Sequence, residues 1–176
     1  GRAVQSEFGS VNFLINNAGI YPRKAWDEYT LEEWDQVMAV NLKGYYLAAR
    51  TFVPLMTHPP ARIVNIASIT QSIGMEYLLP YVSSKAGVVG FTRALARELG
   101  PKSINVNAIS PGAFPTAAEE IHGDLEEYSR WVISRQSLKR RGTPDEVAGV
   151  VLFLCSDLSS FITGQTLQVC GGWDMR

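Results

Sequence analysis

The sequence predicts an α/β fold built on a doubly wound parallel sheet. Short, continuous apolar runs alternate with longer stretches of helical periodicity along the 176 residues. Strands that are buried on both faces of a parallel sheet show this pattern, because helices cover both faces. Strands and helices in strict alternation are joined by right-handed crossovers within one sheet. We therefore expect residues 1–176 to form a single domain.

Four apolar runs are predicted as strands. Each is short and rich in Val or Ile, and they cover residues 11–15, 62–67, 104–109 and 166–169. A helix is expected between the first two, because Thr30 is a suitable N-cap and Glu33 completes a capping box. Its apolar positions continue towards Phe52, and His58-Pro59-Pro60 prevents continuation.

Three further helical segments are predicted. One runs from about residue 81 to 99 and ends at Gly100-Pro101, which combines a C-cap with a residue that cannot continue a helix. The polar, acid-rich stretch 117–136 is expected to form one or two mobile helices. The last helix follows Thr143 as cap, with Pro144 in the first helical position.

One expected part of such a sheet is missing from the sequence. A doubly wound sheet binds a dinucleotide through a Gly-rich turn after its first strand, with an acidic or basic residue roughly 20 positions later. The sequence has neither, and residues 1–9 resemble the end of a helix. We therefore expect the fold to lack its first βαβ units, on the order of 60 to 90 residues.

Composition excludes several classes of function. The 16 basic and 17 acidic side chains are scattered and give a net charge of -1, so no patch for nucleic acid or anionic lipid is expected. Cys155 and Cys170 lack the spacing of metal ligands or of a secreted disulfide framework, which indicates a reducing compartment and no metal site. No apolar run approaches a membrane span of roughly 18 residues. We expect a cytoplasmic protein without a membrane anchor and with a small, neutral partner.

Five separated motifs resemble those of the short-chain dehydrogenase/reductase family, and together they extend over essentially the whole chain. They are Asn16-Asn17-Ala18-Gly19, Asn41 within VNLKG, Ser68 after IVNIA, Tyr81 and Lys85 within YVSSK, and Pro111-Gly112 with Thr116. Two departures from the family pattern stand out. The N-terminal TGxxxGxG turn is absent, and Cys170 replaces a common Asp before Gly171-Gly172.

The resemblance implies a Rossmann-like fold, NAD or NADP as cofactor, and a carbonyl compound or secondary alcohol as small-molecule substrate. The 3-oxoacyl-thioester reductases and the alcohol and sugar dehydrogenases are the most similar subfamilies. The implied catalytic residues are Asn41, Ser68, Tyr81 and Lys85. The implied cofactor-binding residues are Asn16, Ala18, Gly19, Tyr81, Lys85, Pro111, Gly112, Phe114 and Thr116.

Tyr81 and Lys85 form a pair suited to acid–base chemistry. Reduction of a ketone leaves negative charge on oxygen, which needs a proton and interim stabilisation. A free phenol titrates near 10, and a nearby cation lowers that value. Residues i and i+4 of a helix project from one face, so we expect Lys85 to lower the pKa of Tyr81. By resemblance, Lys85 also binds the nicotinamide ribose.

Ser68 and Asn41 each have a functional and a plain interpretation. Ser68 follows a buried strand, so its hydroxyl is expected at the carboxyl edge of the sheet, where it can donate to a substrate oxygen. A turn serine is the alternative. Asn41 lies within a helix, where Asn is mildly unfavourable. The family implies a proton relay through water to Lys85, and a solvated helix Asn is the alternative.

Two segments are predicted to approach the cofactor. Gly19 would allow close approach of the backbone after the first strand, although a plain turn explains it as well. Pro111 and Gly112 end another strand at the same edge. In the family, the backbone near Phe114 and the side chain of Thr116 hold the nicotinamide amide. Thr116 alternatively caps the next helix.

Three hypotheses of function remain. The first is an NAD(P)-dependent oxidoreductase. The second is an inactive fragment or pseudoenzyme that acts only in subunit assembly, which a stop codon upstream of Gly1 would favour. The third is a binding module on the same fold, because fold alone never determines function. The family also implies a homo-oligomer, commonly a tetramer, and the apolar residues of the Tyr81 helix are compatible with it. They are Val88, Val89, Phe91, Leu95 and Leu99.

Overall fold

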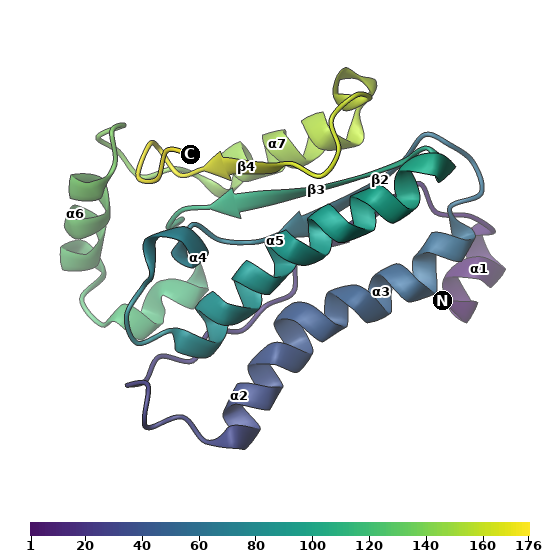
Figure 1. Cartoon of the computed structure of the whole chain (residues 1–176). Helices are drawn as coiled ribbons and strands as arrows, with labels where there is room; N and C mark the ends of the chain where they lie inside the picture. Colours follow the sequence, from purple (N-terminus) through teal and green to yellow (C-terminus); the bar gives the residue numbers. More distant parts are fainter.

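The computed structural model describes residues 1–176, apart from the side chain of Ala118. Its sheet has four parallel strands in the order β1-β2-β3-β4. The strands are β1 (Phe13–Asn16), β2 (Ala61–Ile66), β3 (Ile104–Pro111) and β4 (Thr166–Val169). Helices cover both faces, so the predicted doubly wound fold is confirmed (Figure 1). β1 begins later than predicted, because the Val11 amide donates to the Leu55 carbonyl (3.0 Å) and not to a neighbouring strand.

Two long helical runs pack on one face of the sheet. The first combines α2 (Leu31–Met38), a π-helical turn (Ala39–Lys43) and α3 (Gly44–Phe52), and the second is α5 (Leu79–Leu99). The predicted capping box is present at the start of α2. The Glu33 amide donates to Thr30 Oγ1 (3.2 Å), and the Thr30 amide donates to Glu33 Oε2 (3.0 Å). The helix predicted over residues 30–52 is therefore confirmed, with a π turn in its middle.

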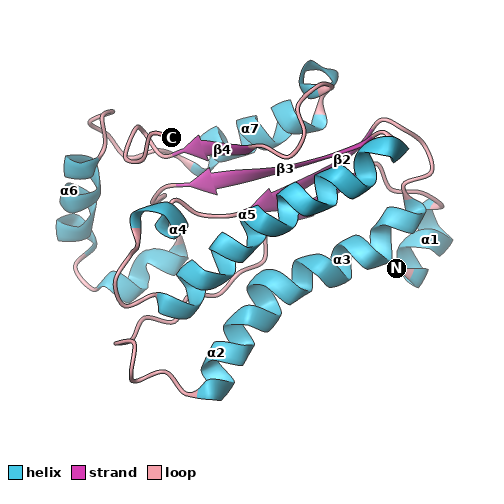
Figure 2. Cartoon of the chain, in the orientation of Figure 1, coloured by secondary structure: helices cyan, strands magenta, loops and turns pink.

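The remaining helices complete the layers (Figure 2). α7 (Pro144–Cys155) packs on the opposite face, against β2 and β3. The stretch 117–136 forms a 3₁₀ turn (Ala117–His122) and α6 (Leu125–Arg135), which confirms the prediction of helix there. The short helix α4 (Thr70–Ile73) was not predicted. α1 (Arg2–Phe8) and 3₁₀ turns at Val53–Leu55, Gly100–Lys102 and Asp157–Ser159 complete the set of described helices.

The core consists of buried clusters on both faces of the sheet. Ile63 and Val106 pack with Leu99 on the α5 face, and Val64 and Ile109 pack with Leu154 on the α7 face. Val88, Val89 and Leu99 of α5 are at most 9% exposed, so much of the apolar surface of this helix is used within the subunit. Among the described helices, none is both long and apolar enough to cross a lipid bilayer.

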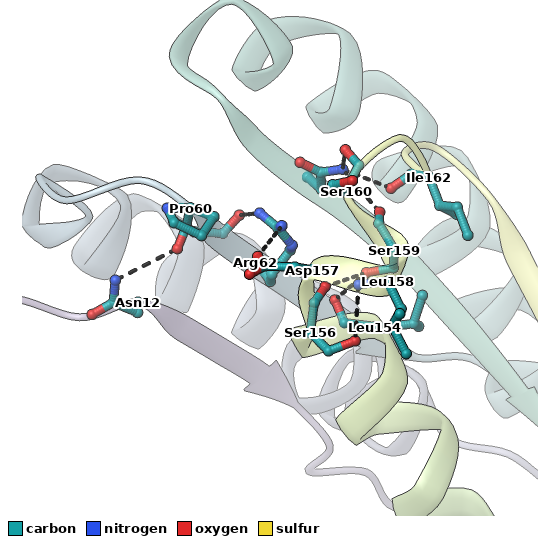
Figure 3. A network of polar contacts seen from close by, with 12 residues as sticks. Asn12, Pro60, Arg62, Leu154, Ser156, Asp157, Leu158, Ser159, Ser160 and Ile162 are labelled. Atoms are coloured by element: carbon teal, nitrogen blue, oxygen red, sulfur yellow. Dashed lines mark hydrogen bonds and ion pairs between the residues drawn. The ribbon is translucent and has the colours of Figure 1, made fainter.

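Buried polar contacts close the amino-end edge of the sheet (Figure 3). Arg62 is 3% exposed; its guanidinium donates to the Ala61 carbonyl (3.1 Å) and lies 3.9 Å from an Asp157 carboxylate oxygen. The Ser159 hydroxyl donates to the Leu154 carbonyl (2.9 Å) at the end of α7. These contacts have a structural role, because in open α/β sheets ligands bind at the carboxyl ends of the strands.

Candidate active site

A cavity of about 460 Å³ lies at the carboxyl edge of the sheet. Because all four strands are parallel, the segments that follow β1, β2 and β3 converge there. Six of the predicted site residues line this cavity: Ser68, Tyr81, Pro111, Gly112, Phe114 and Thr116. The structure therefore brings together residues from three separate motifs at one opening.

Ser68 is positioned with its hydroxyl proton available to a ligand. It follows β2 and is 6% exposed. Its Oγ accepts from the Thr70 amide (3.2 Å) and from the Thr70 hydroxyl (3.0 Å). These contacts occupy both lone pairs of the oxygen, so its own proton can be donated to an acceptor in the cavity.

Tyr81 lies in the first turn of α5 and faces the same cavity. Its ring packs against that of Tyr21, with centroids 5.4 Å apart. Burial raises the pKa of the Tyr81 phenol, and the neighbouring Ser68 hydroxyl acts in the opposite direction. The phenol is therefore protonated at neutral pH in this arrangement.

Lys85 lies one helical turn further along α5, behind the Tyr81 ring. Its Nζ is 5.7 Å from the centroid of that ring and donates to the Ile66 carbonyl (2.6 Å) and the Tyr45 phenol oxygen (3.2 Å). The expectation that Lys85 lowers the Tyr81 pKa is wrong for this arrangement. The ammonium is directed to Ile66 and Tyr45, and burial dominates the Tyr81 pKa and raises it.

Tyr45 is a partner of Lys85 that the sequence analysis missed. It is 2% exposed, and its phenol donates to the Ile66 carbonyl (3.1 Å) while accepting from Lys85. Tyr45 and Asn41 are i and i+4 on one helical run, so they share a face. That spacing was the signal that would have identified it.

Asn41 lies in the π-helical turn and is fully buried. Its Oδ1 accepts from the Ile20 amide (2.8 Å), and its Nδ2 donates to the Ile20 carbonyl (2.9 Å) and to Ser84 Oγ (3.1 Å). π turns within α-helices are frequent at functional sites. The interpretation of Asn41 as a solvated helix residue is therefore wrong, because the side chain fixes the segment after β1.

The segment after β1 divides into two parts. Asn16 is 6% exposed, and its Nδ2 donates to Asn65 Oδ1 (2.8 Å), so this side-chain amide is engaged within the sheet. Ala18 and Gly19 are exposed. A Cβ placed on Gly19 would lie 3.5 Å from both Asn41 Oδ1 and Lys85 Nζ. The glycine therefore leaves open the space above these two side chains.

The segment after β3 approaches the cavity through its backbone. The Gly112 amide donates to the Val169 carbonyl (2.8 Å), and the Pro111 carbonyl accepts from the Ile69 amide (3.1 Å). A Cβ on Gly112 would come within 3.0 Å of the Cys170 backbone. Thr116 lines the cavity and precedes the 3₁₀ turn, where its carbonyl accepts from the Glu119 amide (3.0 Å). Its side chain makes no capping hydrogen bond, so the alternative prediction of Thr116 as a side-chain cap is wrong.

Comparison with known proteins identifies the family. A family model described as enoyl-(acyl carrier protein) reductase matches residues 2–174. The chain belongs to the short-chain dehydrogenase/reductase family. It is 40% identical over 163 residues to a 3-oxoacyl-(acyl-carrier-protein) reductase of Aquifex aeolicus. It is 42% identical over 167 residues to a (2S)-((R)-hydroxy(phenyl)methyl)succinyl-CoA dehydrogenase subunit of Thauera aromatica.

Solved structures of this family have the same fold. A gluconate 5-dehydrogenase of Burkholderia cenocepacia, solved with NADP and tartrate, matches 98% of the chain with a TM-score of 0.93 and 31% identity. A glucose/ribitol dehydrogenase of Brucella melitensis matches 99% of the chain with a TM-score of 0.94 and 34% identity. The alignments cover 68% and 70% of those two chains. The aligned part of this chain is 92% of its length and spans 65% of the Aquifex aeolicus relative.

In this member of the short-chain dehydrogenase/reductase family, a polar and aromatic group covers the cavity. The Glu119 carboxylate pairs with the Arg141 guanidinium at 2.5 Å, and both side chains are largely buried. Glu119, His122 and Tyr128 line the cavity. Burial and the Glu119 charge raise the pKa of Tyr128 to about 12, so this phenol is neutral. The sequence analysis predicted this stretch only as one or two helices, without these contacts.

Burial of Lys85 makes the stability of the folded protein depend on pH. Loss of hydration lowers the pKa of its ammonium to about 8, from 10.5 in water. Between about pH 8 and 10 the unfolded chain therefore binds a proton at Lys85 that the folded protein does not, and stability rises with pH. We expect this group to add on the order of 2 kcal/mol to the free energy of unfolding over that window.

Chemical denaturation at pH 8 and pH 10 tests this effect. Lys85→Met serves as the reference, because it keeps the chain length of the side chain but cannot titrate. The increase in stability with pH should be larger in the parent than in this variant. An equal pH dependence in the two proteins would show that the Lys85 pKa is not lowered.

Proposed function

We propose that the natural polypeptide is an oxidoreductase that transfers a hydride between NAD or NADP and a carbonyl compound or secondary alcohol. The convergence of Ser68 and Tyr81 on one cavity, with the Lys85 ammonium behind the Tyr81 ring, supports this function. Membership of a family whose solved relatives include an NADP complex supports it further.

The described residues fit a nicotinamide nucleotide. An ammonium has three N–H donors, and two are used by Ile66 and Tyr45, so one remains for a ribose hydroxyl. Gly19 leaves the space above Lys85 open. Pro111, Gly112, Phe114 and Thr116 would hold the nicotinamide end. When bound, the cofactor supplies or accepts the hydride.

Tyr81 and Ser68 both act on the substrate oxygen, and each has a different role. Negative charge develops on this oxygen during reduction, and donors placed beforehand stabilise it. Ser68 donates a hydrogen bond to this oxygen, because its contacts with Thr70 leave its own hydroxyl proton available. Tyr81 is protonated, because burial raises its pKa, and it transfers this proton to the oxygen.

Asn41 and Lys85 supply the route by which Tyr81 regains its proton. Asn41 Oδ1 and Lys85 Nζ border the same space beside Gly19, because a Cβ on Gly19 would lie 3.5 Å from each of them. Asn41 Oδ1 has a second lone pair that can accept from a water, since one is used by the Ile20 amide. A water held by Asn41 would deliver a proton to Lys85, and from there to Tyr81.

The substrate class is a 3-oxoacyl thioester, an alcohol or a sugar, since relatives named for each of these types are similar over most of the chain. The test is a screen of the natural polypeptide with NADH and NADPH against ketones, aldehydes and acyl thioesters. We expect consumption of the reduced cofactor with at least one of these classes. No turnover with any of them, despite measurable cofactor binding, would contradict the proposed function.

Replacing Ser68 by Ala should lower kcat/KM roughly 10- to 100-fold, since a hydrogen bond to a charged group contributes about 1.5–3 kcal/mol. The cofactor Kd should stay unchanged. Ser160→Ala is the matched control, because Ser160 is exposed and lies at the opposite edge of the sheet. Steady-state kinetics of the three proteins decide the point. Parent-like turnover in Ser68→Ala would remove this residue from the site.

We also propose that the protein assembles as a homo-oligomer, in keeping with the tetramers that the family resemblance implies. Two apolar side chains near the β4 edge are strongly exposed: Leu152 (71%) on α7 and Phe161 (102%) before β4. Size-exclusion chromatography with light scattering is expected to show four subunits. A monomer at micromolar concentration would contradict this assembly.

A further inference from the structure

Four aromatic rings form a continuous row along the substrate side of the cavity. His122 stacks on Tyr128, with centroids 3.8 Å apart and planes 7° apart. Tyr128 stacks on Trp131 at 5.7 Å, and Trp131 meets Trp173 edge-on at 5.1 Å. The row thus connects α6 to the C-terminal tail, and His122, Tyr128 and Trp173 line the cavity. We call these four residues the aromatic wall.

The tail that carries Trp173 is held in a defined conformation. Gly171 and Gly172 have φ values of +62° and +77°, which turn the chain back after β4. The Gly171 carbonyl accepts from the amides of Ser137 and Leu138, both at 2.9 Å. Figure 1 shows the C-terminus at the same end of the molecule as α4 and α6. The tail is therefore held in place as part of the cavity wall.

Asp174 fastens this tail to α4. Its carboxylate accepts from the Ser72 hydroxyl, from Gln168 Nε2 (2.8 Å) and from Arg176 Nε (3.2 Å), and it is 9% exposed. Arg176 Nη2 also donates to the Ser72 carbonyl (2.6 Å). We call these contacts the Asp174 clasp. α4 begins two residues after Ser68, so the clasp links the aromatic wall to the segment that carries the proposed substrate-binding hydroxyl.

The chemistry of the cavity lining indicates which substituent fits this wall. The cavity lining also includes the apolar side chains of Ile69, Ile73, Met75 and Leu78. Among the described lining residues there is no lysine or arginine, and the one carboxylate, that of Glu119, pairs with Arg141. Burial, with the charges of Arg23 and Arg141, lowers the pKa of His122, so the imidazole is neutral at pH 7. An anionic substituent of the substrate would have no cation to pair with in this lining, whereas a flat apolar substituent would contact aromatic faces and edges.

We propose that the aromatic wall, held by the Asp174 clasp, selects carbonyl substrates that carry a flat, uncharged aryl group beside the reacting carbon. Trp173 acts as the specificity-determining residue, and Asp174 acts as a positioning residue. This inference rests on the proposed oxidoreductase function and names the substrate class of the same cavity. An aryl ring can stack on the aromatic wall, whereas an alkyl chain can only fill the same space. The enzyme should therefore favour an aryl ketone over an alkyl ketone with the same number of carbon atoms.

The test compares acetophenone with 2-octanone, which have the same number of carbons. We expect kcat/KM of the natural polypeptide to favour acetophenone about tenfold. Trp173→Ala should reduce this ratio to near one, mainly by lowering kcat/KM for acetophenone, while Trp173→Phe should retain most of the preference. Trp26→Ala is the matched control, because Trp26 is 74% exposed and lies outside the cavity lining.

The Asp174 clasp is tested by Asp174→Asn, with Asp157→Asn as the matched control at an exposed position. We expect the aryl preference to fall about threefold and hydrogen exchange to accelerate in residues 69–74, with no change in Asp157→Asn. Unchanged exchange and an unchanged preference would overturn the positioning role.

Binding measured by calorimetry separates the two proposals. If neither ketone is turned over but acetophenone binds more tightly than 2-octanone and Trp173→Ala removes the difference, the aromatic wall stands and the oxidoreductase function fails. If both ketones are reduced with equal efficiency and Trp173→Ala leaves the ratio unchanged, the aromatic wall is overturned and the oxidoreductase function stands.

Discussion

Replacing Tyr81 by Phe in the natural polypeptide should lower kcat/KM by about 10²- to 10⁴-fold, which is the contribution expected of a general acid. The change removes one oxygen and keeps the ring that packs 5.4 Å from Tyr21. Burial keeps the phenol protonated, so the variant loses a proton donor and not a charged group. The cofactor Kd and the melting temperature should therefore stay close to those of the parent.

Tyr46→Phe is the matched control for this variant. Tyr46 lies on α3, one residue beyond the buried Tyr45, and is 50% exposed. Steady-state kinetics and calorimetry on both variants check the prediction. Turnover within threefold of the parent in Tyr81→Phe would refute the assignment of Tyr81 as the acid.

Replacing Lys85 by Ala is expected to weaken both turnover and cofactor binding. The side chain is 2% exposed and donates to Ile66 and Tyr45, so its removal takes one of two side-chain donors from the Ile66 carbonyl, which keeps that of Tyr45. We expect kcat/KM to fall about 10²-fold or more, because the proton route and the ribose contact depend on the same ammonium. Calorimetry with NADH and NADPH should show a Kd about tenfold higher.

Two further variants separate the roles of this ammonium. Lys85→Met keeps the length of the side chain, so stability close to that of the parent together with lost turnover would indicate loss of the charge and not of packing. Tyr45→Phe removes one hydrogen-bond partner of Lys85 and should lower turnover less. An unchanged cofactor Kd in Lys85→Ala would count against its role at the ribose.

The arrangement of Lys85 explains why its effect on Tyr81 could not be deduced from spacing. Residues i and i+4 share a helix face, and this correctly placed the two side chains close together. Spacing says nothing of the other partners of an ammonium. The Ile66 carbonyl lies on β2 and Tyr45 on α3, and both are far from α5 in the sequence.

Secondary structure was predictable where local signals and periodicity agreed. β4 matches its prediction, α5 begins within two residues of its predicted start and ends at the predicted Leu99, and α7 begins at the predicted Pro144. α4 was missed, because its four residues are too few for a helical period, and tertiary contacts hold it. Its Ser72 hydroxyl meets Asp174, which lies 102 residues further along the chain.

The sequence by itself determined the order of strands and helices, the parallel sheet and the short polar segments at its carboxyl edge. Apolar periodicity and helix capping are local effects, because each depends on residues that are close together in the sequence. The tertiary structure alone decided which partners Lys85 takes, that Asn41 is bound to Ile20, and that Trp173 lines the cavity. These features depend on contacts between segments distant along the chain, and on burial, which changes hydration and pKa only once the chain is packed.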